Sequence, residues 1–371
     1  MKVLFISAWY PNSAHPLKGI FVKKHAAAIK AAGNEIQVVA ITISDSSETF
    51  ERKIYSETDE NGILTHHIEI NSRFYKWIHL NLFFQYRAIS KYVEKSVIPT
   101  FKPELIHSNV LYPAGILGYK ISKRYNLPHV ITEHWSKVDK FMSQSLFSYI
   151  GKKAYNNAKS VTVVSDFLKK SISKHINNTS IIKIVPNIIN QKVFTFLPKV
   201  GGNSIVFTCV AHWTNPKRPD LIFNALNEIS KISNKNIKLN VVGEGILLEK
   251  LKPLKWNFEI KYLGNLMPEN LAKTLQESDY FLHASTIETF SIVIAEALAT
   301  GTPVLASNVG AIPELINNTN GYVTENTNED WIQNLNQLLK VNYDHASIAQ
   351  QAKKYNEESV GQLFNDVYKQ N

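Results

Sequence analysis

Residues 285–304 read STIETFSIVIAEALATGTPV. Ser291 precedes an apolar run that stops at Gly301, which is the pattern of a buried helix with a start and a stop signal. Two glutamates separated by seven residues flank the helix start, with Glu288 in the preceding loop and Glu296 inside the helix. A carboxylate among apolar neighbours costs several kcal/mol if unpaired, so we expect donors such as ligand hydroxyls around Glu296.

The start of this helix also predicts an anion site. The backbone amides of Phe290, Ser291 and Ile292 lack partners within the helix, and the helix dipole adds positive potential there. A diphosphate would suit this site. The alternative is an ordinary amphipathic helix on which Glu296 is exposed.

Alternating strand and helix patterns extend over the whole chain. At 371 residues the sequence exceeds what one core normally organises, and short β-branched runs alternate with helical patterns twice, as in βαβ units. We therefore predict an α/β protein of two doubly wound, parallel-sheet domains, with a break in regular structure between Asn187 and Asn203. A representative helix is Phe21–Ala32. The predicted strands are Val3–Ser7, Glu35–Ile41, Leu105–His107, His129–Thr132, Val161–Val164 and Ile182–Val185, then Ile205–Val210, Lys238–Val242, Ile260–Leu263, Tyr280–His283, Pro303–Ala306 and Gly321–Val323.

Composition and motifs argue against several classes of protein. The single cysteine, Cys209, allows no internal disulfide and suits a reducing cytoplasm, and no stretch is apolar enough to span a bilayer. No G-x-G-x-x-G follows the first strand, so a dinucleotide-dependent redox enzyme has little support. None of the nine aspartates forms an Asp-x-Asp pair, so we expect no metal and no other cofactor.

Charge is unevenly distributed. Residues 1–185 carry 25 basic and 13 acidic side chains, whereas the remainder carries 16 and 18. The segment Arg73–Arg87 mixes bases with aromatics, which fits either a core-facing helix, our first expectation, or contact with an anionic membrane. No nucleic-acid motif accompanies the charge, so we expect no nucleic-acid partner.

At residues 285–304 the sequence resembles family-4 glycosyltransferases, whose signature is two glutamates separated by seven residues followed by Glu-Ala-Leu-Ala-x-Gly-x-Pro-Val. Here the tail is Glu296–Val304. The resemblance continues at Trp9-Tyr-Pro11, Gly19-Ile-Phe21, Pro186-Asn187, Lys217-Arg-Pro-Asp220 and Leu263-Gly-Asn-Leu266. It implies a GT-B fold, with two Rossmann-like domains facing a cleft: residues 1–190 on the acceptor side, 191–355 binding the nucleotide sugar, and a helix at 356–371 crossing back to the first domain.

The resemblance also implies roles for residues of the second domain. Glu296 matches the glutamate that holds the donor ribose, and Glu288 matches the one facing the hydroxyls of the donor sugar. Lys217 matches the lysine that neutralises the leaving diphosphate. Gly264 and Leu266 lie where the family distinguishes UDP from GDP.

In the first domain, Gly19 matches a glycine loop near the diphosphate and His134 a histidine beside the reacting anomeric carbon. His107 is expected to line the cleft or the acceptor side, and Glu133 to be structural. One departure stands out: His212 occupies the position of a family arginine. Either His212 itself or Arg218 would complete the phosphate clamp.

The expected function is a retaining, metal-independent glycosyltransferase. It would move a sugar from a UDP- or GDP-linked donor to a saccharide or lipid-linked saccharide, in polysaccharide biosynthesis at the cell surface. It would work in the cytoplasm, with peripheral contact to an anionic inner leaflet left open. The alternative is a catalytically silent sugar-nucleotide binding protein. Sequence alone assigns neither the acceptor-binding residues nor the donor base.

Overall fold

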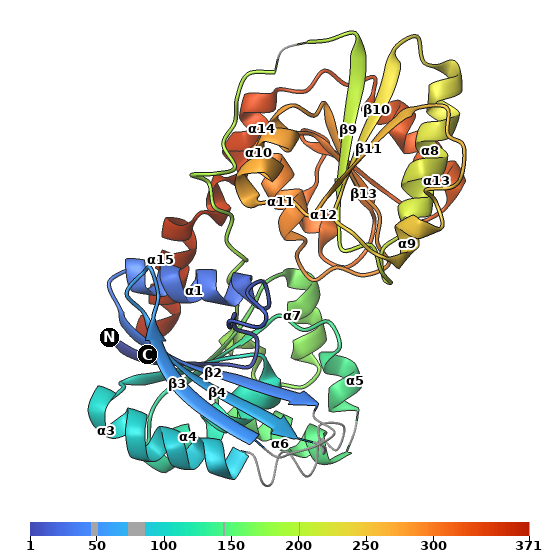
Figure 1. Ribbon diagram of the computed structural model, residues 1–371. Helices are drawn as coiled ribbons and strands as arrows, with labels where there is room; N and C mark the ends of the chain where they lie inside the picture. Colours follow the sequence, from blue (N-terminus) through green and yellow to red (C-terminus); the bar gives the residue numbers. More distant parts are fainter. Residues whose placement is uncertain (46–50, 73–85, 144, 200, 371) are drawn as a thin grey trace. The chain divides into compact units, whose positions relative to one another are not determined.

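The computed structural model describes residues 1–45, 51–72, 86–143, 145–199 and 201–370. The chain divides into two compact units: unit 1 is Met1–Ile188 with Glu357–Asn371, and unit 2 is Ile189–Asn356. Each unit has one sheet, largely parallel in unit 1 and fully parallel in unit 2, with helices packed on it, which confirms the predicted fold class (Figure 1).

Unit 1 contains an eight-stranded sheet in the order β3-β4-β2-β1-β5-β6-β7-β8. All neighbouring strands are parallel except β3 and β4. The strands are β1 Lys2–Ser7, β2 Glu35–Asp45, β3 Glu51–Thr58, β4 Leu64–Ser72, β5 Leu105–Asn109, β6 His129–Glu133, β7 Ser160–Val163 and β8 Ile182–Ile184.

The antiparallel hairpin β3–β4 was missed from the sequence. In β3 every side chain is exposed except the half-buried Tyr55, so its sequence ERKIYSET lacks the apolar alternation that marks a strand. Such polar composition is usual for an edge strand, which must not pair with other chains.

Helices cover both faces of the unit 1 sheet, with α1 and α15 on one face and α3 and α4 on the other (Figure 1). The helices are α1 Ile20–Ala31, α3 Ile98–Phe101, α4 Ile116–Tyr125, α5 Val138–Met142, α6 Ser145–Asn156, α7 Asp166–Ser173 and α15 Glu357–Lys369, with π-helical turns at Val93–Val97 and Leu111–Gly115 and a 3-10 turn at Thr179–Ile181. Of the segment Arg73–Arg87, residues 73–85 lie outside the described part of the chain. Residues 86–92 are helical, and Tyr86 is buried.

The last helix, α15, packs on α1 within unit 1. Its buried side chains include Phe364 and Tyr368, which belong to the unit 1 core. Gly361 allows the close approach, because a Cβ there would lie 2.7 Å from the carbonyl oxygen of Ala28. The C-terminal segment therefore completes the core of the N-terminal unit.

Unit 2 contains a six-stranded, all-parallel sheet in the order β11-β10-β9-β12-β13-β14. The strands are β9 Ser204–Val210, β10 Asn236–Val242, β11 Glu259–Gly264, β12 Tyr280–His283, β13 Val304–Ser307 and β14 Gly321–Thr324. This is the Rossmann order 3-2-1-4-5-6, in which the winding direction reverses between the first and fourth strands, here β9 and β12. Ligands of such sheets bind beyond the carboxyl ends of the strands at that point.

Helices flank this sheet as well, with α8 and α13 on one side and α10, α11 and α14 on the other (Figure 1). The helices are α8 Pro219–Ile232, α9 Ile246–Glu249, α10 Pro268–Gln276, α11 Ile292–Ala299, α12 Ile312–Leu315, α13 Asn328–Leu338 and α14 His345–Gln351, with a 3-10 turn at Ala352–Tyr355. Among the described residues, no helix combines the length and apolarity needed to cross a bilayer.

Candidate functional site

The point where the winding of unit 2 reverses carries Lys217 and His283. Lys217 lies in the loop between β9 and α8, and His283 is the last residue of β12. A backbone bridge pairs Lys217 with Ser285, and residues 216–218 and 284–286 exchange backbone hydrogen bonds. These bonds bring the lysine loop against the loop that follows β12, where the sequence places Glu288.

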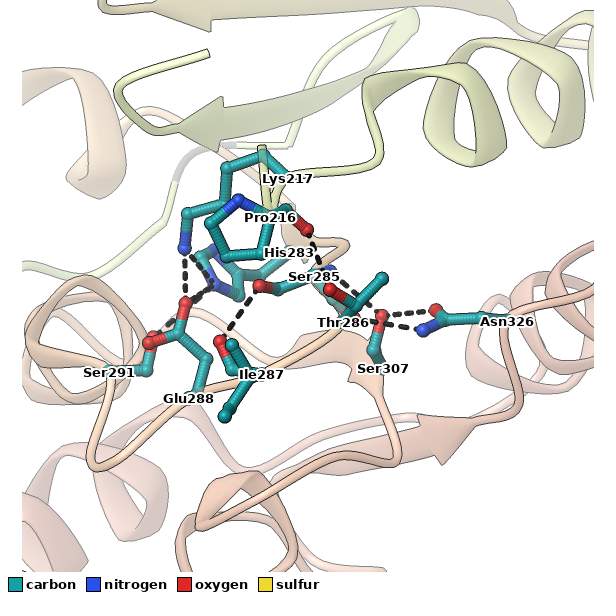
Figure 2. A network of polar contacts seen from close by, with 10 residues as sticks. All are labelled: Pro216, Lys217, His283, Ser285, Thr286, Ile287, Glu288, Ser291, Ser307 and Asn326. Atoms are coloured by element: carbon teal, nitrogen blue, oxygen red, sulfur yellow. Dashed lines mark hydrogen bonds and ion pairs between the residues drawn. The ribbon is translucent and has the colours of Figure 1, made fainter. Parts of the chain in front are cut away.

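One carboxylate oxygen is the centre of the site (Figure 2). Glu288 Oε1 forms an ion pair and a hydrogen bond with Lys217 Nζ, and it lies 2.9 Å from His283 Nε2. Lys217 Nζ is 3.3 Å from the same His283 nitrogen. The three side chains are 17%, 15% and 2% exposed for Lys217, Glu288 and His283 respectively, so the cluster is largely shielded from water.

This surrounding keeps Glu288 ionised. Burial alone would raise the pKa of the Glu288 carboxyl group, but the hydrogen bond with His283 and the charge of Lys217 outweigh it and lower the pKa to about 2. The pKa of His283 is lowered by burial and then by the nearby lysine cation. At neutral pH the cluster therefore contains a cation, an anion and a neutral imidazole.

A second layer of polar contacts fixes the loop that carries Glu288 (Figure 2). Ser307 Oγ accepts the backbone amide of Ser285 at 3.0 Å and donates to Asn326 Oδ1 at 2.6 Å. The Asn326 amide donates back to the Ser285 carbonyl at 2.9 Å. Gly310 has φ +56°, and a Cβ at this position would overlap the Glu288 carbonyl oxygen, so glycine permits the close approach.

The start of α11 differs from the predicted cap. Ser291 is the N-cap residue of α11, as expected, but it has left-handed backbone angles (φ 67°, ψ 80°) and its side chain makes no cap hydrogen bond. The Ser291 hydroxyl instead lies 3.5 Å from His283 Nε2. Phe290 is buried and packs edge-on against Tyr355, whereas Ile292 is half-buried. A non-glycine residue in this conformation stores backbone strain and is typical of functional sites.

Glu296 lies within α11 and is only 7% exposed. The alternative of an exposed glutamate on an amphipathic helix is therefore wrong. A carboxylate buried to this degree has to be hydrogen-bonded or paired.

The remaining donor-side residues of unit 2 follow its other strands. Gly264 ends β11 with φ +63°, its carbonyl accepts the amide of Gly243 at 2.7 Å, and the half-buried Leu266 comes two residues later. The Arg218 guanidinium is bound to Asp220, with Nη2 2.6 Å from Oδ2 and Nε 2.9 Å from Oδ1, and this hydrogen bonding raises its pKa.

His212 is exposed, and no described side chain or backbone group hydrogen-bonds its ring. Of the two proposed replacements for the family arginine, Arg218 is thus already occupied by Asp220, and His212 has its ring available.

In unit 1, both Gly19 and His134 belong to the surroundings of α1. Gly19 precedes α1 with φ +69°, and a Cβ there would overlap the Trp9 carbonyl oxygen. His134 follows β6, and its ring centroid lies 4.9 Å from that of Phe21 and 5.4 Å from that of His25, both on α1.

The surroundings of His134 keep its ring neutral. Burial, and then the neighbouring His25 and His107, lower the pKa of His134 well below its usual range. Its Nε2 is 3.3 Å from Asn109 Oδ1. Within the described chain, His134 Nδ1 and Asn109 Nδ2 are buried without a hydrogen-bond partner, so an acceptor and a donor at the carboxyl ends of β6 and β5 are left unsatisfied.

Two other predictions for unit 1 have opposite outcomes. The expectation that His107 lines a cleft is wrong: its ring is fully buried, with Nδ1 2.6 Å from Tyr368 Oη and Nε2 2.6 Å from Thr132 Oγ1. Glu133 is structural, as expected. Its fully buried carboxylate accepts three backbone amides and the Tyr155 hydroxyl.

His283 is the residue that sequence reasoning missed. Its signal was its position, because it ends the strand directly before the glutamate loop, but a histidine in an apolar strand also fits a core role. Among the described residues, no three histidine, cysteine, aspartate or glutamate side chains gather in a way that could hold a metal ion.

Comparison with known proteins matches the two units separately. The model for glycosyl transferases group 1 matches residues 195–355, and the model for glycosyltransferase family 4 matches residues 19–192. The chain is 26% identical over 277 residues to N-acetyl-alpha-D-glucosaminyl L-malate synthase of Bacillus anthracis, covering 70% of this chain and 71% of the relative. It is 24% identical over 332 residues to the putative teichuronic acid biosynthesis glycosyltransferase TuaC of Bacillus subtilis, covering 85% and 83%.

The fold also resembles solved structures. The complex of Anabaena Alr3699/HepE with UDP-glucose superposes with a TM-score of 0.69 at 16% identity, over 99% of each chain. Two Rossmann-like units, each matched by a glycosyltransferase family model, define a glycosyltransferase of GT-B fold. The chain belongs to the group 1, family-4-like branch of these enzymes.

The charge state of Glu288 leads to a pH-dependent prediction. A carboxyl group whose pKa falls from 4.5 to about 2 on folding stabilises the native state above pH 4.5, and this contribution is lost as the pH falls through about 2. We expect wild-type protein to lose more free energy of unfolding than Glu288→Gln between pH 5 and pH 2, measured by urea denaturation.

The control is Glu249→Gln, which removes an exposed carboxylate paired with Lys252 on the surface of the same unit. Its acid dependence should match that of wild type. An identical acid dependence for Glu288→Gln and wild type would contradict the assignment of a strongly stabilised Glu288 carboxylate.

Proposed function

We propose that the protein is a retaining glycosyltransferase that binds a nucleoside diphosphate sugar at the carboxyl edge of the unit 2 sheet. The observation that carries the proposal is the Lys217–Glu288 pair at the switch point, beside the start of α11. A lysine cation and the amides of Phe290, Ser291 and Ile292 are suited to a diphosphate, and a fixed carboxylate is suited to sugar hydroxyls.

The proposed roles follow the geometry. Lys217 neutralises the leaving diphosphate, with His212 in support, and the buried Glu296 accepts hydrogen bonds from the ribose. Glu288 binds hydroxyls of the donor sugar, while neutral His134 of unit 1 contacts the reacting sugar. Gly19, Gly264 and Leu266 shape the approach to the diphosphate and the base.

In the proposed reaction the bond between the anomeric carbon and the β-phosphate oxygen breaks, and the nucleoside diphosphate leaves with the electron pair. The acceptor hydroxyl forms the new bond on the same face and passes its proton to the departing phosphate oxygen. Positive charge from Lys217 and α11 does the work that a metal ion does elsewhere, so we propose metal independence.

The decisive experiment for donor binding is thermal unfolding with UDP- and GDP-linked sugars, with and without EDTA. A ligand that binds only the native state raises the melting temperature by mass action. We expect one nucleotide class to stabilise wild type equally with and without EDTA, and Glu296→Ala to abolish the shift. UDP sugars are the first to test, because the structure of Alr3699/HepE holds UDP-glucose.

Each other outcome has a distinct meaning. Stabilisation that requires magnesium would contradict metal independence, and no stabilisation by any sugar nucleotide would contradict the donor assignment. Binding without release of nucleoside diphosphate in the presence of saccharide acceptors would favour the catalytically silent binding protein. The observation behind that alternative is the exposed His212 at the position of the family arginine.

We further propose that the acceptor is a saccharide or lipid-linked saccharide met at an anionic membrane surface on the cytoplasmic side, in synthesis of a cell-surface polysaccharide. The described chain supplies a basic face for this contact: α4 and α6 touch each other and contain no acidic residue. Its exposed basic and aromatic members are Lys120, Lys123, Arg124, Tyr125, Tyr149, Lys152 and Lys153. Exposed tyrosine among lysines is suited to a membrane interface.

We expect wild type to co-sediment at low salt with vesicles containing phosphatidylglycerol and not with pure phosphatidylcholine, since each basic residue near the surface contributes about 1 kcal/mol. Changing Lys120, Lys123, Lys152 and Lys153 to Glu should abolish binding. The control, Glu at Lys235, Lys250, Lys255 and Lys340, makes the same change in net charge on exposed sites of unit 2. Equal loss in both variants, or no binding by wild type, would contradict a specific α4–α6 surface.

A further inference from the structure

One oxygen of Glu288 serves two donors. Lys217 Nζ and His283 Nε2 both approach Oε1, whereas the described part of the chain supplies no hydrogen-bond donor to the second oxygen, Oε2. Oε1 is thus the atom by which the protein holds the carboxylate, and Oε2 is the atom available to a ligand hydroxyl.

The two donors differ in how firmly they are held. His283 is part of β12, where it pairs with Ala306 of β13, and its ring is 2% exposed and stacked with that of Phe281. A ring packed into a sheet has one position. Lys217 reaches Oε1 from a loop through a flexible four-carbon stem and is 17% exposed, so it can move away.

A single nitrogen cannot satisfy both neighbours. If His283 Nε2 carries its proton, it donates to Glu288 and meets the lysine donor without a hydrogen bond. If Nε2 is bare, it accepts from Lys217 and offers nothing to Glu288. The 3.3 Å and 2.9 Å contacts therefore compete, and removal of the lysine resolves the competition in favour of the histidine–glutamate bond.

The proposed function requires that departure. A lysine that neutralises the leaving diphosphate cannot also remain fully engaged with Glu288, and a nearly buried carboxylate that loses its cation needs another donor. We infer that His283 is a positioning residue that keeps Glu288 ordered toward the donor sugar when Lys217 turns to the diphosphate. This inference rests on the proposed function and adds to it a residue that neither the sequence nor the family models assign.

Two variants separate this role from simple packing. Glutamine places its amide nitrogen about where Nε2 lies, whereas asparagine places it near Nδ1 and falls short of Glu288. We expect His283→Asn to lower the ratio of the affinity for nucleotide sugar to that for the matching nucleoside diphosphate by about tenfold, as for loss of a hydrogen bond to a charged group. His283→Gln should retain most of the ratio.

The measurement is isothermal titration calorimetry of each variant with nucleoside diphosphate and nucleotide sugar. The control is His345→Gln, a histidine of the same unit whose Nδ1 lies 2.8 Å from the Gly301 carbonyl oxygen. A wild-type ratio in His283→Asn would overturn the inference. Equal weakening of both ligands would also overturn it, because a merely structural histidine would act on both. If wild type binds neither ligand, the proposed function fails instead.

Discussion

An ionised glutamate held by a lysine and a histidine is the constraint on which the rest of unit 2 depends. Glu288 keeps its charge at low exposure only because Lys217 and His283 lie against one of its oxygens. That arrangement requires β9 and β12 to be neighbours, the loops after them to be bridged, and a glycine at position 310 to let the chain pass behind the Glu288 carbonyl. The left-handed backbone at Ser291 then starts α11 directly beside the cluster. The order of the strands, the bridged loops and the start of α11 therefore all position the carboxylate of Glu288.

Unit 1 supplies a contrasting environment. Its histidines at positions 25, 107 and 134 are buried, and burial lowers the pKa of each. They gather between α1, the strand ends and α15, with Phe364 of α15 packed against both His25 and His107. The histidine cluster of unit 1 is therefore neutral and buried, whereas charge is concentrated around Glu288 and Lys217 in unit 2. The C-terminal helix is thus part of the surroundings of this histidine cluster.

The sequence predicted what depends on local pattern and missed what depends on tertiary neighbours. The parallel strands, the burial of Glu296 and the helix after residue 290 follow from apolar periodicity and stop signals. The β3–β4 hairpin was missed because an exposed edge strand has no apolar alternation, and His107 was misplaced because its partner Tyr368 lies 261 residues away. His283 and the engagement of Arg218 by Asp220 are matters of side-chain geometry. A motif can locate Lys217 and Glu288, but it cannot show that they bind each other.

That mutual binding leads to the most direct test, a double-mutant cycle on the affinity for nucleoside diphosphate, measured by calorimetry in Glu288→Gln, Lys217→Met and the combined variant. Removing the charge of Glu288 frees Lys217 for the diphosphate. Glu288→Gln should therefore tighten nucleoside diphosphate binding, by about threefold to tenfold more when Lys217 is present than in Lys217→Met. An equal effect in both backgrounds, or weaker binding in Glu288→Gln with Lys217 intact, would contradict the transfer of Lys217 from glutamate to diphosphate.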